Sequence, residues 1–251
     1  MASTFLRWLL TLVVLAAATT AGADEIQVAV AANFSAPIKL IAADFEKITG
    51  HKAVLSFGAT GKFYAQITNG APFEVFLAAD EETPAKLEKE GAAVQGSRFT
   101  YATGKLVLWS AQPGLVDAQG DILKKDAYKK IAIAAPKLAP YGAAALETMT
   151  NLGLLSSLKT KLVTAESIGQ AFSFVSTGNA EIGFVALSQV YEGGTIKRGS
   201  AWIVPENLHR PIRQDAVLLT RAKNNQAALM LLAFLRTENA KAVIRSFGYE
   251  P

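Results

Sequence analysis

Strand-like and helix-like stretches alternate along almost the whole chain, and this order constrains the fold more than any other feature. The apolar run at 26–31 predicts a strand, and the helical spacing of apolar residues over 35–49 predicts the helix that follows it. Further strands are predicted at 52–57, 74–79, 105–109, 131–134, 162–165, 182–186 and 202–204. Such alternation is typical of α/β proteins, in which helices cover parallel or mixed sheets.

Two extended stretches interrupt this order and predict crossings between two parts of the chain. One covers 98–108 and is broken at Gly104, and the other covers 211–219. Predicted helices at 225–235 and 238–247 follow the second stretch and would return to the first part. The sequence therefore predicts one lobe from 24–103 plus 213–251, and a second lobe from 104–212.

The first 23 residues have the three parts of a secretory signal peptide. Arg7 supplies a positive charge, 8–18 is an apolar run, and Ala21-Gly22-Ala23 has the small residues of a cleavage site. The apolar run is shorter than the roughly 20 residues that a membrane span needs. We expect cleavage after Ala23 and an exported mature chain that begins at Asp24.

Composition excludes several classes of function. The mature chain has 24 basic and 21 acidic residues once Arg7 is removed, a net charge of +3 without any basic block, so a nucleic-acid partner is not expected. No cysteine is present, which excludes thiol catalysis and a lipid anchor on cysteine. The two histidines, His51 and His209, have no metal-ligand partner at suitable spacing, and no G-x-S-x-G motif occurs. We expect a protein that is not an enzyme and that has no cofactor.

A glycine-rich turn, Gly58-Ala59-Thr60-Gly61-Lys62, connects a predicted strand to a predicted helix. It is not a nucleotide-binding P-loop, since Ser56 and Phe63 stand where that motif has glycine and a hydroxyl residue. The first backbone N–H groups of a helix have no partner within it and attract anions. The turn therefore predicts an anion contact, and the alternative is a tight turn in which Thr60 only caps the helix.

Three more helix starts share this property. The turn at 31–37 follows the first strand, with Ser35 as the predicted cap and Pro37 in the first helical turn. In open α/β sheets such turns meet at the carboxyl edge of the strands, where ligands bind. Helices that open at Tyr141 and at Ile168 could supply N–H groups from the second lobe; aromatic packing and ordinary capping are the alternatives there.

Around these turns the chain resembles the periplasmic molybdate-binding proteins of ABC importers. The resemblance covers the mature chain and is carried by AANFSAP, SFGATGKFYAQITNGAPFEVFLAAD, SRFTYATGKLVLWS, APKLAPYG and AESIGQAFSFVSTGNAEIGFVALSQV. It implies a type II periplasmic-binding-protein fold, in which two lobes with mixed sheets are joined by a two-stranded hinge. It also implies that a monomer in the periplasm captures molybdate or tungstate and delivers it to a membrane permease.

The resemblance also assigns ligand contacts. Asn33 matches the first contact, Thr60 matches a hydroxyl contact that is usually serine, and Tyr141 and Ile168 match backbone N–H contacts. All four would touch molybdate oxygens, and none would be a direct ligand of the metal. Two positions depart from the pattern, because Ala32 and Ala186 stand where some members have a threonine and a tyrosine.

The chemistry of these turns favours an anion that carries no proton. Six or seven hydrogen bonds to a charged group, at about 1.5–3 kcal/mol each, would be enough for nanomolar binding without a basic side chain. Phosphate keeps a proton near neutral pH and needs an acceptor, yet no Asp or Glu occurs in 31–37 or 57–62. The alternatives are another tetrahedral oxyanion such as sulfate, a sensor subunit with the same site, and, with less support, a secreted α/β hydrolase.

Overall fold

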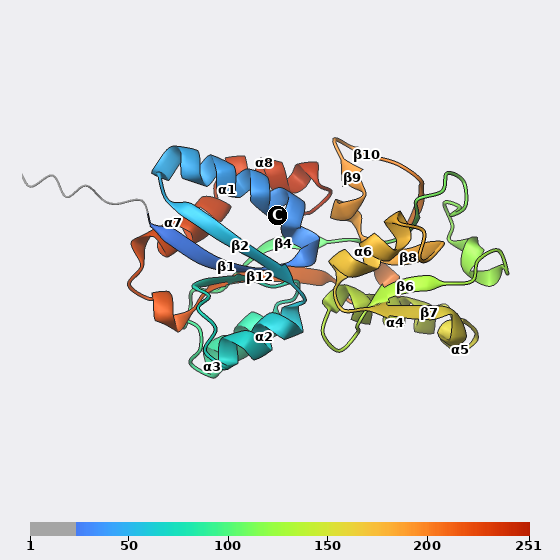
Figure 1. The fold of residues 1–251 in the computed structure, drawn as a ribbon, viewed down its shortest axis with the longest axis horizontal. Coiled ribbons are helices and arrows are strands. Elements are labelled where there is room, and N and C mark those ends of the chain that lie inside the picture. Colours follow the sequence, from blue (N-terminus) through green and yellow to red (C-terminus); the bar gives the residue numbers. More distant parts are fainter. Residues whose placement is uncertain (1–23) are drawn as a thin grey trace, which may run out of the picture.

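The computed structural model describes residues 24–251, and the predicted signal peptide lies outside the described residues. The chain forms two halves side by side, each built around one five-stranded mixed sheet (Figure 1). This arrangement confirms the predicted α/β class and the two-sheet architecture.

The first sheet has the strand order β2-β1-β3-β12-β4. Its first three strands are parallel, and β12 runs antiparallel to both of its neighbours. The strands are β1 (Glu25–Ala31), β2 (Lys52–Gly58), β3 (Val75–Leu77), β4 (Phe99–Gly104) and β12 (Ile212–Leu218). The helices of this half are α1 (Ser35–Thr49), α2 (Thr60–Thr68), α3 (Glu82–Lys89), α7 (Gln226–Leu235) and α8 (Glu238–Ser246).

Helix α1 shows how local sequence sets an element of this half. Its apolar positions Ile38, Ile41 and Phe45 are fully buried against the sheet and stabilise the fold by roughly 1.5–3 kcal/mol each. Gly50 ends the helix with φ of 77°, a left-handed conformation that glycine adopts without strain. The predicted cap was wrong: Ser35 is the first helical residue, and its side chain makes no capping bond, because a 3-10 turn at Ala32–Phe34 precedes it.

The second sheet has the strand order β11-β5-β8-β6-β7, in which β6 is parallel to both β7 and β8. Its strands are β5 (Leu106–Ser110), β6 (Ile131–Ala134), β7 (Leu162–Ala165), β8 (Ile182–Ala186) and β11 (Ser200–Ile203). Its helices are α4 (Pro140–Asn151), α5 (Leu155–Leu158) and α6 (Ile168–Ser176). A two-stranded ribbon, β9 (Tyr191–Glu192) and β10 (Thr195–Ile196), belongs to this half, and short 3-10 turns occur in it at Asp121–Lys124, Lys159–Lys161, Leu187–Gln189 and Glu206–Leu208. A further 3-10 turn, Thr220–Ala222, follows β12 in the first half.

The chain crosses between the halves twice. It passes from β4 to β5 around Lys105, and it returns from β11 into β12. Strands β4 and β12 are paired antiparallel, so the two crossings lie side by side as a two-stranded connection. After β12, the helices α7 and α8 pack against α1 in the first half (Figure 1).

Each half has its own apolar core. The largest buried cluster fills the second half around Trp109, Ile133 and Phe184. Two further clusters lie on the faces of the first sheet, one under α1 and α7 and the other under α2 and α3. Among residues 24–251, no helix combines the length and the apolar character needed to cross a bilayer.

Candidate functional site

The four residues singled out by the sequence lie around one small cavity between the two halves. Thr60 begins α2, Tyr141 is the second residue of α4, Ile168 begins α6, and Asn33 lies in the 3-10 turn before α1. Two of these elements come from the first half and two from the second. N–H groups in the first turn of a helix have no intrahelical partner, so the cavity lies where several free donors converge.

The wall of this cavity is electrically neutral. It is formed by backbone and by small or uncharged side chains, and no Asp, Glu, Lys, Arg or His is among them: Ala31, Ala32, Asn33, Gly58, Ala59, Thr60, Ala79, Ala139, Pro140, Tyr141 and Ile168. The free volume is only about 10 Å³. By this measure the cavity has room for about one water molecule. A larger anion would enter only if its walls moved apart, and it would meet dipoles rather than counter-charges.

Thr60 faces the cavity from a buried position, with 2% of its surface exposed. The alternative that it caps α2 is wrong, because the N-cap residue is Ala59 and no side chain caps this helix. The Thr60 hydroxyl oxygen instead accepts a hydrogen bond of 3.0 Å from the backbone N–H of Ala79. The hydroxyl proton is not used in that bond, so it remains available to an anion.

Asn33 is also buried, and its side-chain nitrogen is bound within the protein. Nδ2 donates to Gln214 Oε1 at 2.8 Å and to the Tyr249 hydroxyl at 2.9 Å. These bonds use both amide hydrogens. Asn33 Oδ1 has no hydrogen-bond partner among residues 24–251 and is one of only two buried side-chain polar atoms there with none.

The side chain of Tyr141 makes a contact that the sequence did not reveal. Its hydroxyl accepts a hydrogen bond of 3.0 Å from Gln214 Nε2, which joins α4 of the second half to β12 of the first. Burial raises the pKa of Tyr141 well above its usual value, so the hydroxyl stays protonated at any physiological pH. Gln214 and Tyr249 were missed because nothing in their local sequence distinguishes them. Gln214 reaches the site through the place of β12 in the sheet, and Tyr249 reaches it through the segment that follows α8.

Close backbone contacts surround the cavity. Gly61 N–H donates to the Leu138 carbonyl across the two halves at 2.9 Å. A Cβ on Gly61 would lie 3.1 Å from the Leu138 Cα, so a side chain there would press the halves apart. Ser167 caps α6, the ordinary role that was the alternative at this helix start, because its hydroxyl accepts from Gln170 N at 3.3 Å. Lys62 forms an exposed ion pair with Glu166 between the halves.

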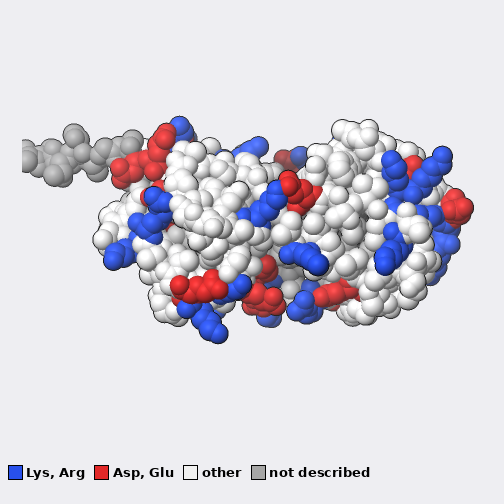
Figure 2. Space-filling view, turned by 60° about the horizontal axis from the view of Figure 1, so that its bottom comes forward, with Lys and Arg blue, Asp and Glu red and all other residues white. Residues whose placement is uncertain are grey.

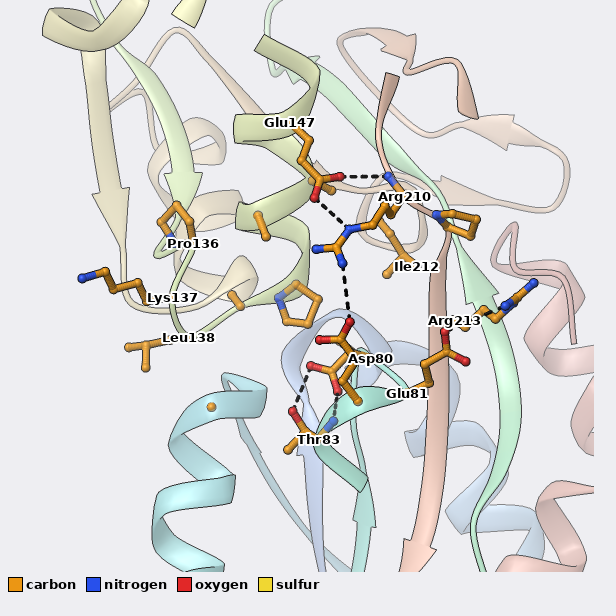
Figure 3. Close-up of a pocket in the computed structure, with 18 residues that line it drawn as sticks. Asp80, Glu81, Thr83, Pro136, Lys137, Leu138, Glu147, Arg210, Ile212 and Arg213 are labelled. Carbon is orange, nitrogen blue, oxygen red and sulfur yellow. Dashed lines mark hydrogen bonds and ion pairs between the residues drawn. The ribbon is translucent and has the colours of Figure 1, made fainter. Parts of the chain in front are cut away.

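A larger groove of about 480 Å³ adjoins the cavity and shares Ala79, Ala139 and Pro140 with it. Figure 3 shows Arg210 lying between Glu147 and the segment that carries Asp80. The Arg210 guanidinium contacts Glu147 at 3.0 Å and Glu82 at 3.5 Å, so it bridges α4 to α3 of the other half. Burial raises the pKa of the Asp80 carboxyl, although Thr83 N–H and its hydroxyl donate to it.

Most charged side chains of the groove are paired with one another: Arg210 with Glu82 and Glu147, and Arg213 with Glu81. Acidic and basic side chains are interspersed along the boundary between the halves (Figure 2). Within the described residues, no three His, Cys, Asp or Glu side chains are grouped closely enough to bind a metal.

Comparisons with known proteins agree with this geometry. A family model described as "Bacterial extracellular solute-binding protein" matches residues 26–250. The molybdate-binding protein ModA of Azotobacter vinelandii is 62% identical over 232 residues, 92% of either chain, and that of Rhodobacter capsulatus is 54% identical over 94% of this chain and 92% of the relative. A solved Azotobacter vinelandii periplasmic molybdate-binding protein has a TM-score of 0.88 and 44% identity, covering 90% of this chain and 99% of that one.

Proposed function

The chain belongs to the bacterial extracellular solute-binding proteins, and on that premise we propose that it captures molybdate in the periplasm and delivers it to the permease of an ABC importer. Similarity to two molybdate-binding relatives over nearly their full length supports the choice of ligand. In this proposal the protein binds and releases its ligand unchanged and has no catalytic residue.

One observation carries the proposal: helix starts from both halves converge on a cavity with no charged side chain. Asn33, Thr60, Tyr141 and Ile168 are the proposed contacts, with Tyr141 and Ile168 acting through backbone N–H. Each charge-assisted hydrogen bond contributes about 1.5–3 kcal/mol, and the positive ends of helix dipoles add up to about 2 kcal/mol each. A dianion is therefore held without a basic residue.

The neutral wall also supports a ligand that carries no proton. Molybdate and tungstate are proton-free dianions near neutral pH, and both accept hydrogen bonds on all four oxygens. Hydrogen phosphate needs an acceptor for its proton, and no carboxylate lines the cavity. Sulfate has the same charge and shape but is smaller, so in this proposal it contacts fewer of the donors at once.

We also propose that the two halves move as lobes. In this view residues 24–103 plus 213–251 and residues 104–212 separate to admit the anion and close to bury it, bending at the paired crossings β4–β5 and β11–β12. The cavity has no room for a hydrated ion, which supports a closing motion as part of binding.

Calorimetry on the mature chain, residues 24–251, tests the ligand. Molybdate and tungstate should each bind with one site per monomer and tight affinity, whereas sulfate and phosphate should bind far more weakly. Thr60→Ser serves as a matched control, because it keeps the hydroxyl. Sulfate that competed with molybdate at equal concentration would disprove the molybdate assignment and would support the sulfate alternative.

Delivery to a permease needs its own test. A cell that lacks this protein should lose molybdate uptake at low external concentration, and the wild-type gene should restore it. Uptake that is unaffected, with molybdate binding intact in the purified protein, would favour a sensor role for the same site.

A further inference from the structure

A buried chain of amide and hydroxyl groups lies behind the anion cavity, and Gln214 is at its centre. Gln214 is fully buried in β12. Its Oε1 is 2.8 Å from Asn33 Nδ2 and 3.0 Å from the Tyr101 hydroxyl, and its Nε2 is 3.0 Å from the Tyr141 hydroxyl. The Gln214 amide thus connects Asn33, a proposed ligand contact, to Tyr101 on strand β4 and to Tyr141 in the second half.

The backbone around Gln214 is shaped to hold it there. The register of β12 against β4 shifts between Gln214 and Asp215, and both of these consecutive residues are fully buried. Asp215 is paired with Arg98, whereas the Gln214 side chain contacts Asn33 and Tyr141, two residues that line the cavity. At the end of β4, a side chain on Gly104 would overlap both the Tyr141 hydroxyl and Gln214 Nε2, so only glycine leaves room for this contact.

In the arrangement described so far, Asn33 presents the wrong atom to an anion. Both of its amide hydrogens are directed to Gln214 and Tyr249, and Oδ1 is the atom without a partner. A carbonyl oxygen repels a dianion, and a buried acceptor without a donor destabilises the protein. The Asn33 side chain can donate to an oxyanion only if its amide is turned by half a turn.

Such a turn is possible only if Gln214 turns as well. With Asn33 Oδ1 in the place of Nδ2, a donor must face it, and Gln214 supplies one when its own Nε2 takes the place of Oε1. The single proton of the Tyr249 hydroxyl, 2.9 Å from the same Asn33 atom, then turns to it and leaves the Asn33 carbonyl and Ser188 Oγ, which lie 3.0 Å and 2.9 Å away. The Asn33 carbonyl keeps a donor, because Ser188 Oγ donates to it at 2.8 Å. The heavy atoms keep their positions, since the oxygen and nitrogen of an amide have the same shape.

The tyrosines complete the turned arrangement. The Tyr101 hydroxyl donates to the Ala78 carbonyl at 2.9 Å and accepts from the turned Gln214 Nε2. The Tyr141 hydroxyl, until then an acceptor, donates to Gln214 Oε1. Burial raises the pKa of both tyrosines well above the usual value, so both protons stay in place. Every amide atom of the pair then has a partner or faces the anion.

We propose that Gln214 is a positioning residue for the anion site: its amide orientation decides whether Asn33 offers an N–H or an oxygen to the ligand. The N–H suits a proton-free dianion such as molybdate, and the oxygen suits an anion that carries a proton, such as hydrogen phosphate. This inference rests on the proposed function and adds to it the device that excludes protonated oxyanions.

Two substitutions separate orientation from packing. In Gln214→Glu the carboxylate can only accept, so it holds the Asn33 nitrogen and leaves Oδ1 toward the ligand. Molybdate affinity should fall about 10–150-fold, the loss expected for one charge-assisted bond, while hydrogen phosphate should be affected much less. Gln214→Met fills similar space without donating or accepting, and should lower molybdate affinity less than Gln214→Glu does.

Because a new carboxylate also repels a dianion directly, the same substitutions are repeated in Asn33→Ala. Asn33→Ala leaves no side-chain amide at position 33 to be oriented. In that background, the loss of molybdate affinity caused by Gln214→Glu measures only the repulsion by the new carboxylate. The loss of affinity should be several-fold larger with Asn33 present than without it. Equal losses in the two backgrounds would overturn the proposal, even if wild-type protein binds molybdate tightly.

Side-chain amide signals in the NMR spectrum of the ¹⁵N-labelled mature chain give a readout independent of affinity. The NH₂ pairs are assigned by their disappearance in Asn33→Ala and Gln214→Met, and both should shift when molybdate is added. A Gln214 pair that stays in place while the Asn33 pair shifts would overturn the coupled turn. Wild-type protein that binds no molybdate would overturn the proposed function, and this assignment with it.

Discussion

Replacement of Thr60 tests the anion site most directly, because its hydroxyl has two separable roles. The oxygen accepts from Ala79 N–H at 3.0 Å, and the proton is free for the ligand. Thr60→Val preserves the shape and removes both roles. Loss of one charge-assisted bond lowers binding by about 1.5–3 kcal/mol, which corresponds to roughly a 10–150-fold weaker affinity.

The other role affects stability rather than affinity. Without the hydroxyl, the buried Ala79 N–H has lost its acceptor with and without ligand, so the unliganded protein should lose about 1–3 kcal/mol of unfolding free energy. Chemical denaturation without ligand measures this loss, and calorimetry measures the affinity. Thr60→Ser retains the oxygen and the proton, and should stay within a few-fold of wild-type affinity.

Two results would refute the reasoning. If Thr60→Val binds molybdate as tightly as wild type and loses only stability, the hydroxyl serves Ala79 alone. If Thr60→Ser binds as weakly as Thr60→Val, the methyl group and its packing are what matter.

Three further predictions concern the other parts of the site. Ile168→Pro should weaken molybdate binding by about 10–150-fold, because proline fits the first position of a helix yet removes the N–H; Ile168→Val keeps the donor and should bind normally in the same titration. Gly61→Ala should weaken molybdate binding, because its Cβ would meet Leu138 of the other half. In small-angle scattering, molybdate should reduce the radius of gyration of the wild type, and it should reduce that of Gly61→Ala less. A wild-type radius that molybdate leaves unchanged would contradict lobe closure. Burial alone would raise the pKa of Glu147, but the hydrogen bonds from Arg210 outweigh it and lower the pKa. The ion pair therefore stabilises the fold near neutral pH, and this contribution is lost as pH falls through the lowered pKa. Glu147→Gln should lower the unfolding free energy near neutral pH, and its difference from wild type should disappear as pH falls below the pKa of Glu147; a difference that does not narrow on acidification would argue against the ion pair.

The sequence by itself determined the order of elements, often to the residue. The helix over 35–49 and the strands over 131–134, 162–165 and 182–186 were predicted with the bounds that the structure has. Periodicity and end signals such as Gly50 are local, so the residues that set an element lie within it or beside it. The four helix starts of the site were found for the same reason.

Tertiary structure decided what those helix starts contact. Asn33 meets Gln214 and Tyr249, which are 181 and 216 positions away in the chain. These contacts depend on β12 entering the first sheet between β3 and β4, on its register shift, and on a carboxyl-terminal segment that returns to the first half. The local sequence around Thr60 is compatible with a helix cap. In the structure its hydroxyl oxygen instead accepts from the backbone N–H of Ala79, which follows another strand of the sheet. Local sequence sets which donors are free, but only the packing of distant segments sets where they point and which atom of a buried amide faces the ligand.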